Sequence, residues 1–443
     1  MNTFKAKVNK IILRLTSVGL LILLIFPASL SAHHFRYGTI SWKQTGNARE
    51  IEVFMQIGWT ANHGSFRESD DYSPFVAGYV GSIVGGDGDV AYLNEIKWGD
   101  SSTTGKMDHK IISREGGNWK PSVSGSAGDC SASECTKNTL SEMGLYTASA
   151  SPKWKPGMTH TYSSDDNYTI YWTASSRATV ENSNGNPWRN ETKVNIGGAY
   201  AGNNSPVGAV PYVVQVQDNT IFRYQVSALD PDGDTLGYRW GTKAEFFNSS
   251  GDFVMPTGMA LSPSGLIEWD IRDSVLSDGD GGEEGDLWVS VIMVEDSTSS
   301  GDNKSYIPLD FFFKLASADN DPPAFTVFPT GTQTVVIGDN KTFTIKSTDD
   351  RGEPPTVSVL NPPSADNKSM WDNVSSISVD NETTFTIHFA PNSTQDNDTY
   401  AVNIRSTDND SMTYDKTLAI RVTSVSNAVP PLQFLYPPQM VTM

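Results

Sequence analysis

Three aspartates on alternate positions are the residues best suited to bind a cation. Asp230, Asp232 and Asp234 lie in the stretch DPDGDT, directly after the β-rich run FRYQVSAL. Such carboxylates, with a glycine that permits a tight turn, can direct oxygen ligands at a hard cation such as calcium. The glycine is at the fourth position of the stretch, whereas an EF-hand has it at the sixth, so the pattern is not an EF-hand. An ion-free polar turn is the alternative interpretation, since turns favour the same residues.

Further acidic residues follow β-rich runs elsewhere in the chain. Asp296 ends the run LWVSVIMVED and is a companion candidate for the same cation. Asp349-Asp350 and Asp408-Asn409-Asp410 each follow a run that ends in Ser-Thr. This recurrence predicts a repeated turn first and cation ligands second.

The histidines raise the possibility of copper chemistry. Cleavage after Ala32 would place His33 at the mature N-terminus. Its amine and ring could chelate copper together with His63, His109 or His160, as in the histidine-brace oxygenases; surface or loop histidines are the alternative. The chain has no G-x-S-x-G and no H-E-x-x-H motif, and its many carboxylates single out no glycosidase pair. We therefore expect a binding protein rather than an enzyme, with a copper oxygenase as an alternative.

Two tryptophans are candidate sugar contacts. Trp119 in GGNWKP and Trp188 in NPWRN lie in loop-like sequence, and flat aromatic faces bind carbohydrate rings well. Trp42, Trp59 and Trp172 lie on alternating runs and are expected to fill a core instead. A carbohydrate-binding protein that uses this part of the chain is a further alternative.

The N-terminal residues are typical of an export signal. A basic start precedes an apolar run at residues 15–26 and a stretch of small residues that ends at Ala32. A membrane span needs about 20 apolar residues, so a cleaved signal at 1–32 is expected, with an uncleaved anchor as the alternative. Cys130 and Cys135 are the only cysteines, and in an oxidising compartment they are expected to form one local disulfide. The sequence therefore predicts a secreted or cell-surface protein with no membrane span after signal removal.

Short β-rich runs must position these residues. Runs such as EIEVFMQIGW, YTIYWTAS and TFTIHFA are separated by clusters of Gly, Asn, Asp, Ser and Pro, and no stretch has a sustained helical period. The pattern predicts an all-β fold of tandem β-sandwich modules behind an N-terminal β domain. The expected divisions are 33–203 (an aromatic-rich N-terminal domain), 204–316 and 317–425 (two sandwiches), and 426–443 (a Pro-rich tail that resembles the start of a truncated further module).

The charge is concentrated in the two rear modules. The net charge is −19, and residues 204–316 hold 18 acidic and 6 basic residues, against 18 and 15 in residues 33–203. Residues 317–443 hold 15 acidic and 7 basic residues. This distribution argues against nucleic acid and anionic lipid as partners and suits cations.

The stretch A-x-DPDGDTL-x-Y, the later Gly-Leu-Ile-Glu-Trp and the strand that ends at Asp296 resemble cadherin-like and immunoglobulin-like modules, the dystroglycan-type cadherin-like branch in particular. Asp319, Asn320 and Asp321 fall on the N-D-N positions of the cadherin linker D-x-N-D-N-x-P-x-F, while Ser317 replaces its first Asp. The resemblance implies Greek-key sandwiches stiffened by calcium at module junctions, in adhesion or matrix proteins. It implies an extracellular protein or glycan as the partner.

Overall fold

The computed structural model describes most of the chain after the N-terminal segment. The described residues are 35–60, 83–85, 95–104, 108–114, 138–147, 153–174, 177–178, 180–183, 187–218, 220–247, 255–256, 258–272, 284–317, 319–361 and 373–424. Cys130, Cys135 and Trp119 lie outside these ranges, as do His33, His63 and the tail at 426–443.

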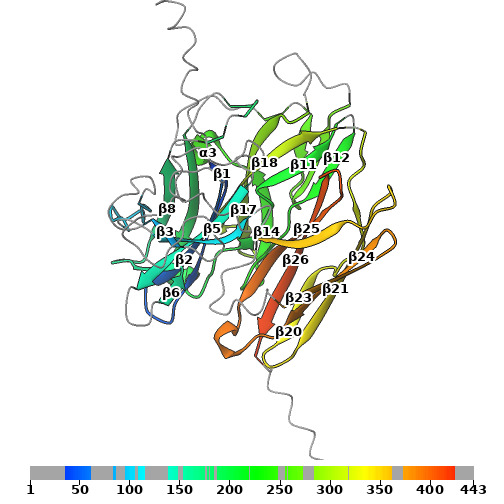
Figure 1. Ribbon diagram of the computed structural model, residues 1–443. Coiled ribbons are helices and arrows are strands. Elements are labelled where there is room, and N and C mark those ends of the chain that lie inside the picture. The colour runs from blue at the N-terminus through cyan, green and yellow to red at the C-terminus, as the bar shows by residue number, and fades with distance from the viewer. Residues whose placement is uncertain are drawn as a thin grey trace, which may run out of the picture. The chain divides into compact units, whose positions relative to one another are not determined.

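The first strand group is the part of the chain up to residue 195. Its strands are β1 (Phe35–Gln44), β2 (Glu50–Thr60), β3 (Ile83–Gly85), β4 (Asp108–Arg114), β5 (Asn138–Thr147), β6 (Lys153–Pro156), β7 (Met158–Thr161), β8 (Asn167–Ala174) and β9 (Trp188–Asn195). β1 and β2 form a long antiparallel pair, and β2 pairs in turn with β5 and β7. Apolar residues on alternate positions of these strands meet the aromatic side chains of β8 and β9 in one core. Figure 1 shows the backbone of these strands.

The second strand group is a two-layer sandwich with one short α-helix. It follows η2 (Gly198–Tyr200), and its elements are β10 (Val207–Gly208), β11 (Val213–Gln217), β12 (Ile221–Gln225), β13 (Ala228–Leu229), β14 (Thr235–Trp240), α3 (Lys243–Phe247), β15 (Met259–Leu261), β16 (Leu266–Asp270), β17 (Leu287–Ser297) and β18 (Asn303–Ala316). One layer has the order β12-β16-β15, and the other has β14-β17-β18 with β11 parallel to β18. Trp269 and Trp288, one from each layer, pack edge to face at 5.8 Å between ring centroids.

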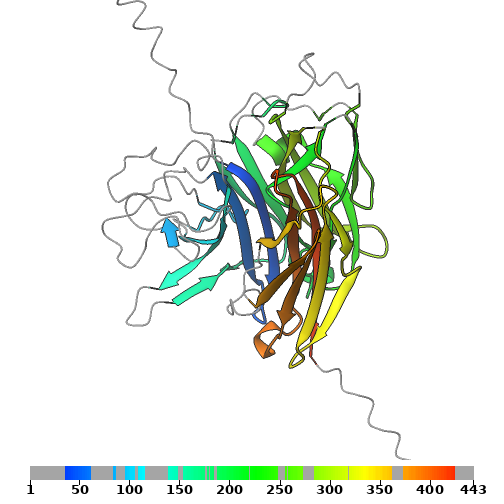
Figure 2. The ribbon, with the colours of Figure 1, turned by 45° about the vertical axis from the view of Figure 1, so that its right-hand side comes forward.

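The third strand group is a sandwich of two four-stranded sheets. Its elements are β19 (Ala324–Val327), β20 (Thr332–Val336), β21 (Lys341–Thr348), β22 (Thr356–Asn361), β23 (Val374–Val379), β24 (Glu382–Phe389), η3 (Ser393–Gln395), β25 (Thr399–Thr407) and β26 (Thr413–Thr423). The sheets have the orders β19-β21-β24-β23 and β20-β26-β25-β22. The strands of this group are coloured from yellow to red in Figure 2. Alternate residues of β24 are buried, as expected for a strand with one face on a core.

The second and third strand groups repeat one topology. In each, a strand near the start runs parallel to the last strand: β11 with β18, and β20 with β26. The last strand pairs with the strand before it, which in turn pairs with the strand three strands earlier in the chain: β17 with β14, and β25 with β22. The facing layers correspond in the same way, with β12-β16-β15 matching β21-β24-β23. Equivalent loops therefore lie at the same end of each sandwich.

The first and second strand groups share one sheet. β1 and β9 each form a bridge to β18, at Gly38 with Asp310 and at Lys193 with Tyr306. The side chains of Arg177 and Asp310 form a bidentate ion pair with two 2.7 Å hydrogen bonds, and both are fully buried. These contacts join the two groups through the interior; the module boundaries predicted at 203 and 316 stay predictions.

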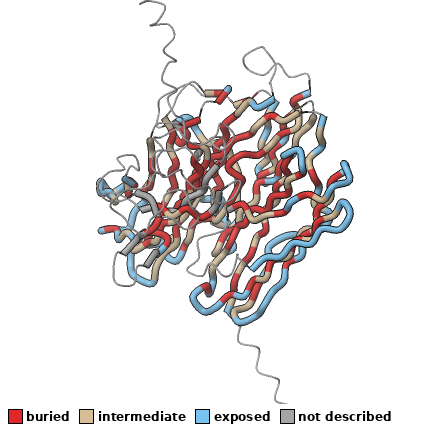
Figure 3. Tube along the Cα trace, in the orientation of Figure 1, coloured by how far each residue is buried: buried red, intermediate tan, exposed pale blue. Residues whose placement is uncertain are grey.

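The all-β fold class predicted from the sequence is confirmed: the described residues form sheets and β-sandwiches with one short α-helix. Figure 3 shows buried residues along the central strands of each group, with exposed residues in loops and on outer strands. Trp42, Trp59 and Trp172 are buried core residues as expected. Among the described residues, no helix has the length and apolar character needed to cross a membrane.

Candidate metal centre

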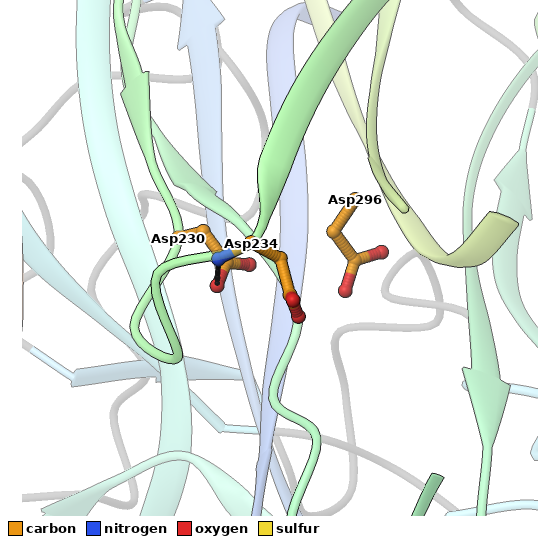
Figure 4. A group of neighbouring side chains, drawn as sticks. All are labelled: Asp230, Asp234 and Asp296. Carbon is orange, nitrogen blue, oxygen red and sulfur yellow. Dashed lines mark hydrogen bonds between the residues drawn. The ribbon is translucent and has the colours of Figure 1, made fainter. Parts of the chain in front are cut away.

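Asp230, Asp234 and Asp296 meet at one end of the second strand group. Asp230 follows β13, Asp234 precedes β14, and Asp296 lies near the end of β17. One carboxylate oxygen from each lies within 4.8 Å of the others. In Figure 4, the aspartates of the turn and Asp296 approach each other from two segments that are far apart in the sequence. Because β14 and β17 are antiparallel neighbours, the start of one lies beside the end of the other.

A tight turn presents the first two carboxylates. Asp230 Oδ1 accepts hydrogen bonds from the backbone N–H groups of Asp232 and Asp234, both at 2.9 Å (Figure 4 shows the second). Gly233 has a φ of 87°, a value that favours glycine. Asp230 Oδ1 is thus committed to shaping the turn. Its Oδ2 is buried and has no hydrogen-bond partner.

Asp296 is held from two sides. Its Oδ1 accepts from the backbone N–H of Ser305 at 2.5 Å and from the Ser305 hydroxyl at 2.7 Å. Its Oδ2 accepts from Asn203 Nδ2 at 3.1 Å. Asn203 is only 4% exposed, and its amide Oδ1 has no hydrogen-bond partner. Asp230, Asp234, Asp296 and Asn203 are called the Asp230 cluster below.

Asp232 has a different role from its neighbours. Its two oxygens accept from the backbone N–H of Asn204 at 2.6 Å and from Asn204 Nδ2 at 2.8 Å. Alternate side chains share one face only where the backbone is extended, and the backbone turns at Gly233, so the three aspartates need not point the same way. The structure therefore brings Asp230 and Asp234 together with Asp296. The Asp232 carboxylate instead contacts Asn204, on the segment that leads into the second strand group.

Burial and like charge make the Asp230 cluster electrostatically costly. Burial raises the pKa of Asp230 from its ordinary value of 3.8 to about 6, against the backbone hydrogen bond from Asp234, and the charges of Asp232, Asp296 and Asp234 add to the rise. Burial also raises the pKa of Asp296, although its hydrogen bonds from Ser305 and Asn203 oppose the shift. A bound cation would remove this cost, because an opposite charge favours ionised carboxylates.

The donor set fits a hard divalent cation. Calcium takes carboxylate and amide oxygens in flexible geometries. Asp230 Oδ2 and Asn203 Oδ1 are buried oxygens without hydrogen-bond partners. The carboxylates of Asp230, Asp234 and Asp296 lie together, and Asn203 contacts Asp296 through its Nδ2. Buried polar atoms are seldom left without a partner unless a water or an ion satisfies them. These four residues are the ones that would hold calcium.

The third strand group repeats part of this arrangement. Asp349 follows β21 and Asp408 follows β25, at positions equivalent to those of Asp230 and Asp296. Asn320 Nδ2 donates to Asp408 Oδ2 at 2.6 Å, as Asn203 does to Asp296. Asn320 Oδ1 and Asp349 Oδ1 are buried without hydrogen-bond partners. Burial raises the pKa of Asp349, and the charge of Asp408 adds to the rise against a backbone hydrogen bond from Arg351. Asp349, Asp408 and Asn320 are called the Asp349 cluster below.

Of the predicted linker ligands, Asn320 belongs to this cluster. Asp321 Oδ1 accepts from Gln217 Nε2 at 2.7 Å instead. The Asp319 backbone N–H donates to the Ser317 hydroxyl at 3.2 Å, and its carbonyl accepts from the Arg351 guanidinium. The Asp321 carboxylate and the backbone of Asp319 thus form hydrogen bonds with other residues of the protein.

Sequence reasoning missed Asn203 and gave Asp349 and Asp408 second place as ligands. The signal was the repeat itself: an Asn before the first strand of each group, an Asp after the second core strand and an Asp at or just after the end of the penultimate strand. Recognising it requires the equivalence of β12 with β21 and of β17 with β25, which becomes evident once the sheet pairings are known.

One candidate sugar contact is wrong. Trp188 is fully buried and stacks on Phe35 at 3.9 Å between ring centroids, with Trp172 against its edge. The loop-like motif NPWRN is in fact the start of β9, whose apolar face fills the first core. Of the candidate copper residues, His109 is buried against Trp172, and His160 Nε2 lies 2.8 Å from Asp100 Oδ2.

Parts of this chain are weakly similar to solved immunoglobulin and cadherin structures. No protein-family model and no curated protein matches the chain. The siglec domain of GspB is 16% identical with a TM-score of 0.21, covering 24% of this chain and 59% of that structure. The tandem immunoglobulin repeats of Dlar are 14% identical with a TM-score of 0.20, covering 49% and 98%. Drosophila N-cadherin EC1-4 is 12% identical with a TM-score of 0.22, covering 58% of each chain. These TM-scores are low, so the description of the fold rests on the strand pairings of this chain.

Proposed function

We propose that the protein is a secreted or cell-surface binding protein of the adhesive kind, whose second and third strand groups are stiffened by calcium. An export signal and a partner that is an extracellular protein or glycan complete the proposal. The observation that carries it is the pair of buried, unpartnered oxygens, Asp230 Oδ2 and Asn203 Oδ1, beside two further carboxylates.

The position of the clusters supports a structural role for the ion. The Asp230 cluster includes Asn203 from the segment before the second strand group, and the Asp349 cluster includes Asn320 from the segment before the third. A cation that binds both the segment and the sandwich would restrict their relative motion. Such a restriction suits a protein that holds a partner at a fixed distance, and no catalytic step is required of it.

Calcium titration of the mature chain, followed by calorimetry, tests the proposal. The wild type should bind calcium, and Asp230→Asn should lose one binding event because a neutral amide no longer offers a charged ligand. Asp339→Asn is the matched control, because Asp339 is exposed in a turn of the third strand group. Equal binding by all three proteins, or no binding by the wild type, would contradict the proposal.

A further inference from the structure

Lys304 places an ammonium group at the Asp230 cluster. Its Nζ donates to Asp234 Oδ2 in an ion pair, with both side chains mostly buried at 17% and 21% exposure. Lys304 belongs to β18, and the next residue, Ser305, donates to Asp296. Within the described residues, Lys304 is the one basic side chain that forms a salt bridge with a carboxylate of the cluster.

The other basic groups nearby have different partners. Lys193 Nζ donates to the carbonyl and the side-chain oxygen of Asn303, at 3.1 and 3.0 Å. Arg421 donates to the backbone carbonyl of Asp230 at 2.5 Å rather than to its carboxylate. The charge of Lys304 is therefore the one applied directly to the ligand oxygens.

The Asp349 cluster offers an internal comparison. Met412 N–H donates to Asp408 Oδ1 at 2.8 Å, as Ser305 N–H donates to Asp296 Oδ1. Met412 is thus the equivalent of Ser305, and the residue before it is Ser411 where the second strand group has Lys304. Ser411 carries no charge, and its carbonyl accepts from Gln215 Nε2. The repeated arrangement has an ammonium group in one copy and none in the other.

We infer that the ammonium of Lys304 competes with a divalent cation for the carboxylates of the Asp230 cluster. The cation binds only when this ammonium leaves Asp234. This inference rests on the proposed function. One carboxylate oxygen from each of Asp230, Asp234 and Asp296 lies within 4.8 Å of the others, so an ion among them would be close to the ammonium that contacts Asp234. At such separations two positive charges repel strongly outside bulk water. The Asp349 cluster has the uncharged Ser411 at the equivalent position and fills at lower cation concentration.

Lys304→Met tests the inference by calcium calorimetry on the mature chain. A hydrogen bond to a charged group contributes enough that its removal should raise the calcium affinity of the Asp230 cluster roughly tenfold. Lys314→Met is the matched control, since Lys314 lies ten residues further along the same strand and has the same charge. The control should leave the affinity unchanged, which separates local competition from an effect of net charge.

The wild-type protein offers a second measurement should Lys304→Met fail to fold. Amine-reactive labelling followed by mass spectrometry should show Lys304 protected in chelator and more accessible in calcium, with Lys314 unchanged. Calcium binding by the wild type with unaltered affinity in Lys304→Met, or with Lys304 protected in both buffers, would overturn the role of Lys304 alone. Absence of calcium binding in the wild type would overturn both this inference and the proposed function.

Discussion

At the scale of single residues, the Asp230 cluster combines committed and uncommitted oxygens. Asp230 Oδ1 shapes the turn through two backbone hydrogen bonds, while its Oδ2 has no partner. Asn203 divides its amide in the same way, with Nδ2 on Asp296 and Oδ1 without a partner. Oxygens positioned by the protein and left without a donor are what a cation requires, because little reorganisation accompanies binding.

The raised pKa of Asp230 predicts a pH-dependent loss of stability in chelator. Its folded pKa of about 6 exceeds the ordinary value of 3.8, so the folded state holds the proton more tightly. Stability from the neutral carboxyl is complete below about 3.8 and is lost as pH rises through about 6. Asp230→Asn imitates the neutral form and should be more stable than the wild type at pH 7 in chelator, by on the order of 2 kcal/mol.

Urea denaturation in chelator at several pH values checks this prediction. The difference between wild type and Asp230→Asn should be near zero at pH 4 and grow towards pH 7. In calcium the order should reverse at pH 7, because the asparagine weakens the cation site. A constant difference across this pH range would contradict the assignment of the raised pKa to Asp230.

At the scale of elements, the first and second strand groups depend on one buried ion pair. Arg177 and Asp310 are fully buried, and the guanidinium also lies over the rings of Phe35 and Phe246 at 5.2 and 4.9 Å. Burial raises the pKa of Asp310, and Arg177 opposes that shift. The carboxylate on β18 therefore depends on a partner from the first strand group.

Arg177→Met should lower the free energy of unfolding by about 3–5 kcal/mol, because it leaves the charge of Asp310 buried and unpaired. Removing both charges in Arg177→Met with Asp310→Leu should recover most of the loss. Urea denaturation of both variants provides the measurement. A double variant no more stable than Arg177→Met would contradict this explanation.

The core of the first strand group gives a second prediction at this scale. Trp188→Ala should cost about 3–5 kcal/mol, because it removes a fully buried ring that contacts Phe35 and Trp172. Ile377→Ala is the control, because Ile377 on β23 is 67% exposed and its loss should change stability by less than about 0.5 kcal/mol. Thermal denaturation of both variants decides the matter, and a mild effect of Trp188→Ala would show that its ring is accessible.

The sequence predicted local features and missed those that depend on distant contacts. The alternating runs around Trp42 and Trp172 predicted buried strands, and DPDGDT predicted a turn, since both depend on neighbouring residues. The sequence could not show that Asp232 has a different role from Asp230 and Asp234. That difference depends on the turn at Gly233, which has a positive φ, and on the contact of the Asp232 carboxylate with Asn204. Trp188 was misplaced because its flanking Asn and Pro suggested a loop, while the buried face of β9 follows from pairing with β8.

Contacts across long stretches of chain explain the remaining omissions. Asn203 contacts Asp296 from the segment before β10, and the pairing of β14, β17 and β18 brings Lys304 to Asp234; no local pattern marks either contact. The ion pair of Arg177 with Asp310 is of the same kind.

At the scale of the whole molecule, the acidic charge and the repeated fold support each other. The net charge of −19 is concentrated in the two strand groups that share one topology and one arrangement of Asn and Asp at equivalent loops. Self-repulsion of such a charge destabilises a compact state, and bound divalent cations would reduce it. A calcium-dependent protein is expected from this balance.

A thermal melt of the mature chain in calcium and in chelator tests the central claim most directly. The melting temperature should rise in calcium, because an ion that binds only the folded state stabilises it. The rise should shrink in Asp230→Asn and in Asp349→Asn, and should persist in Asp339→Asn. Identical melting temperatures in the two buffers for the wild type would contradict the account and leave both aspartate clusters as ion-free turns.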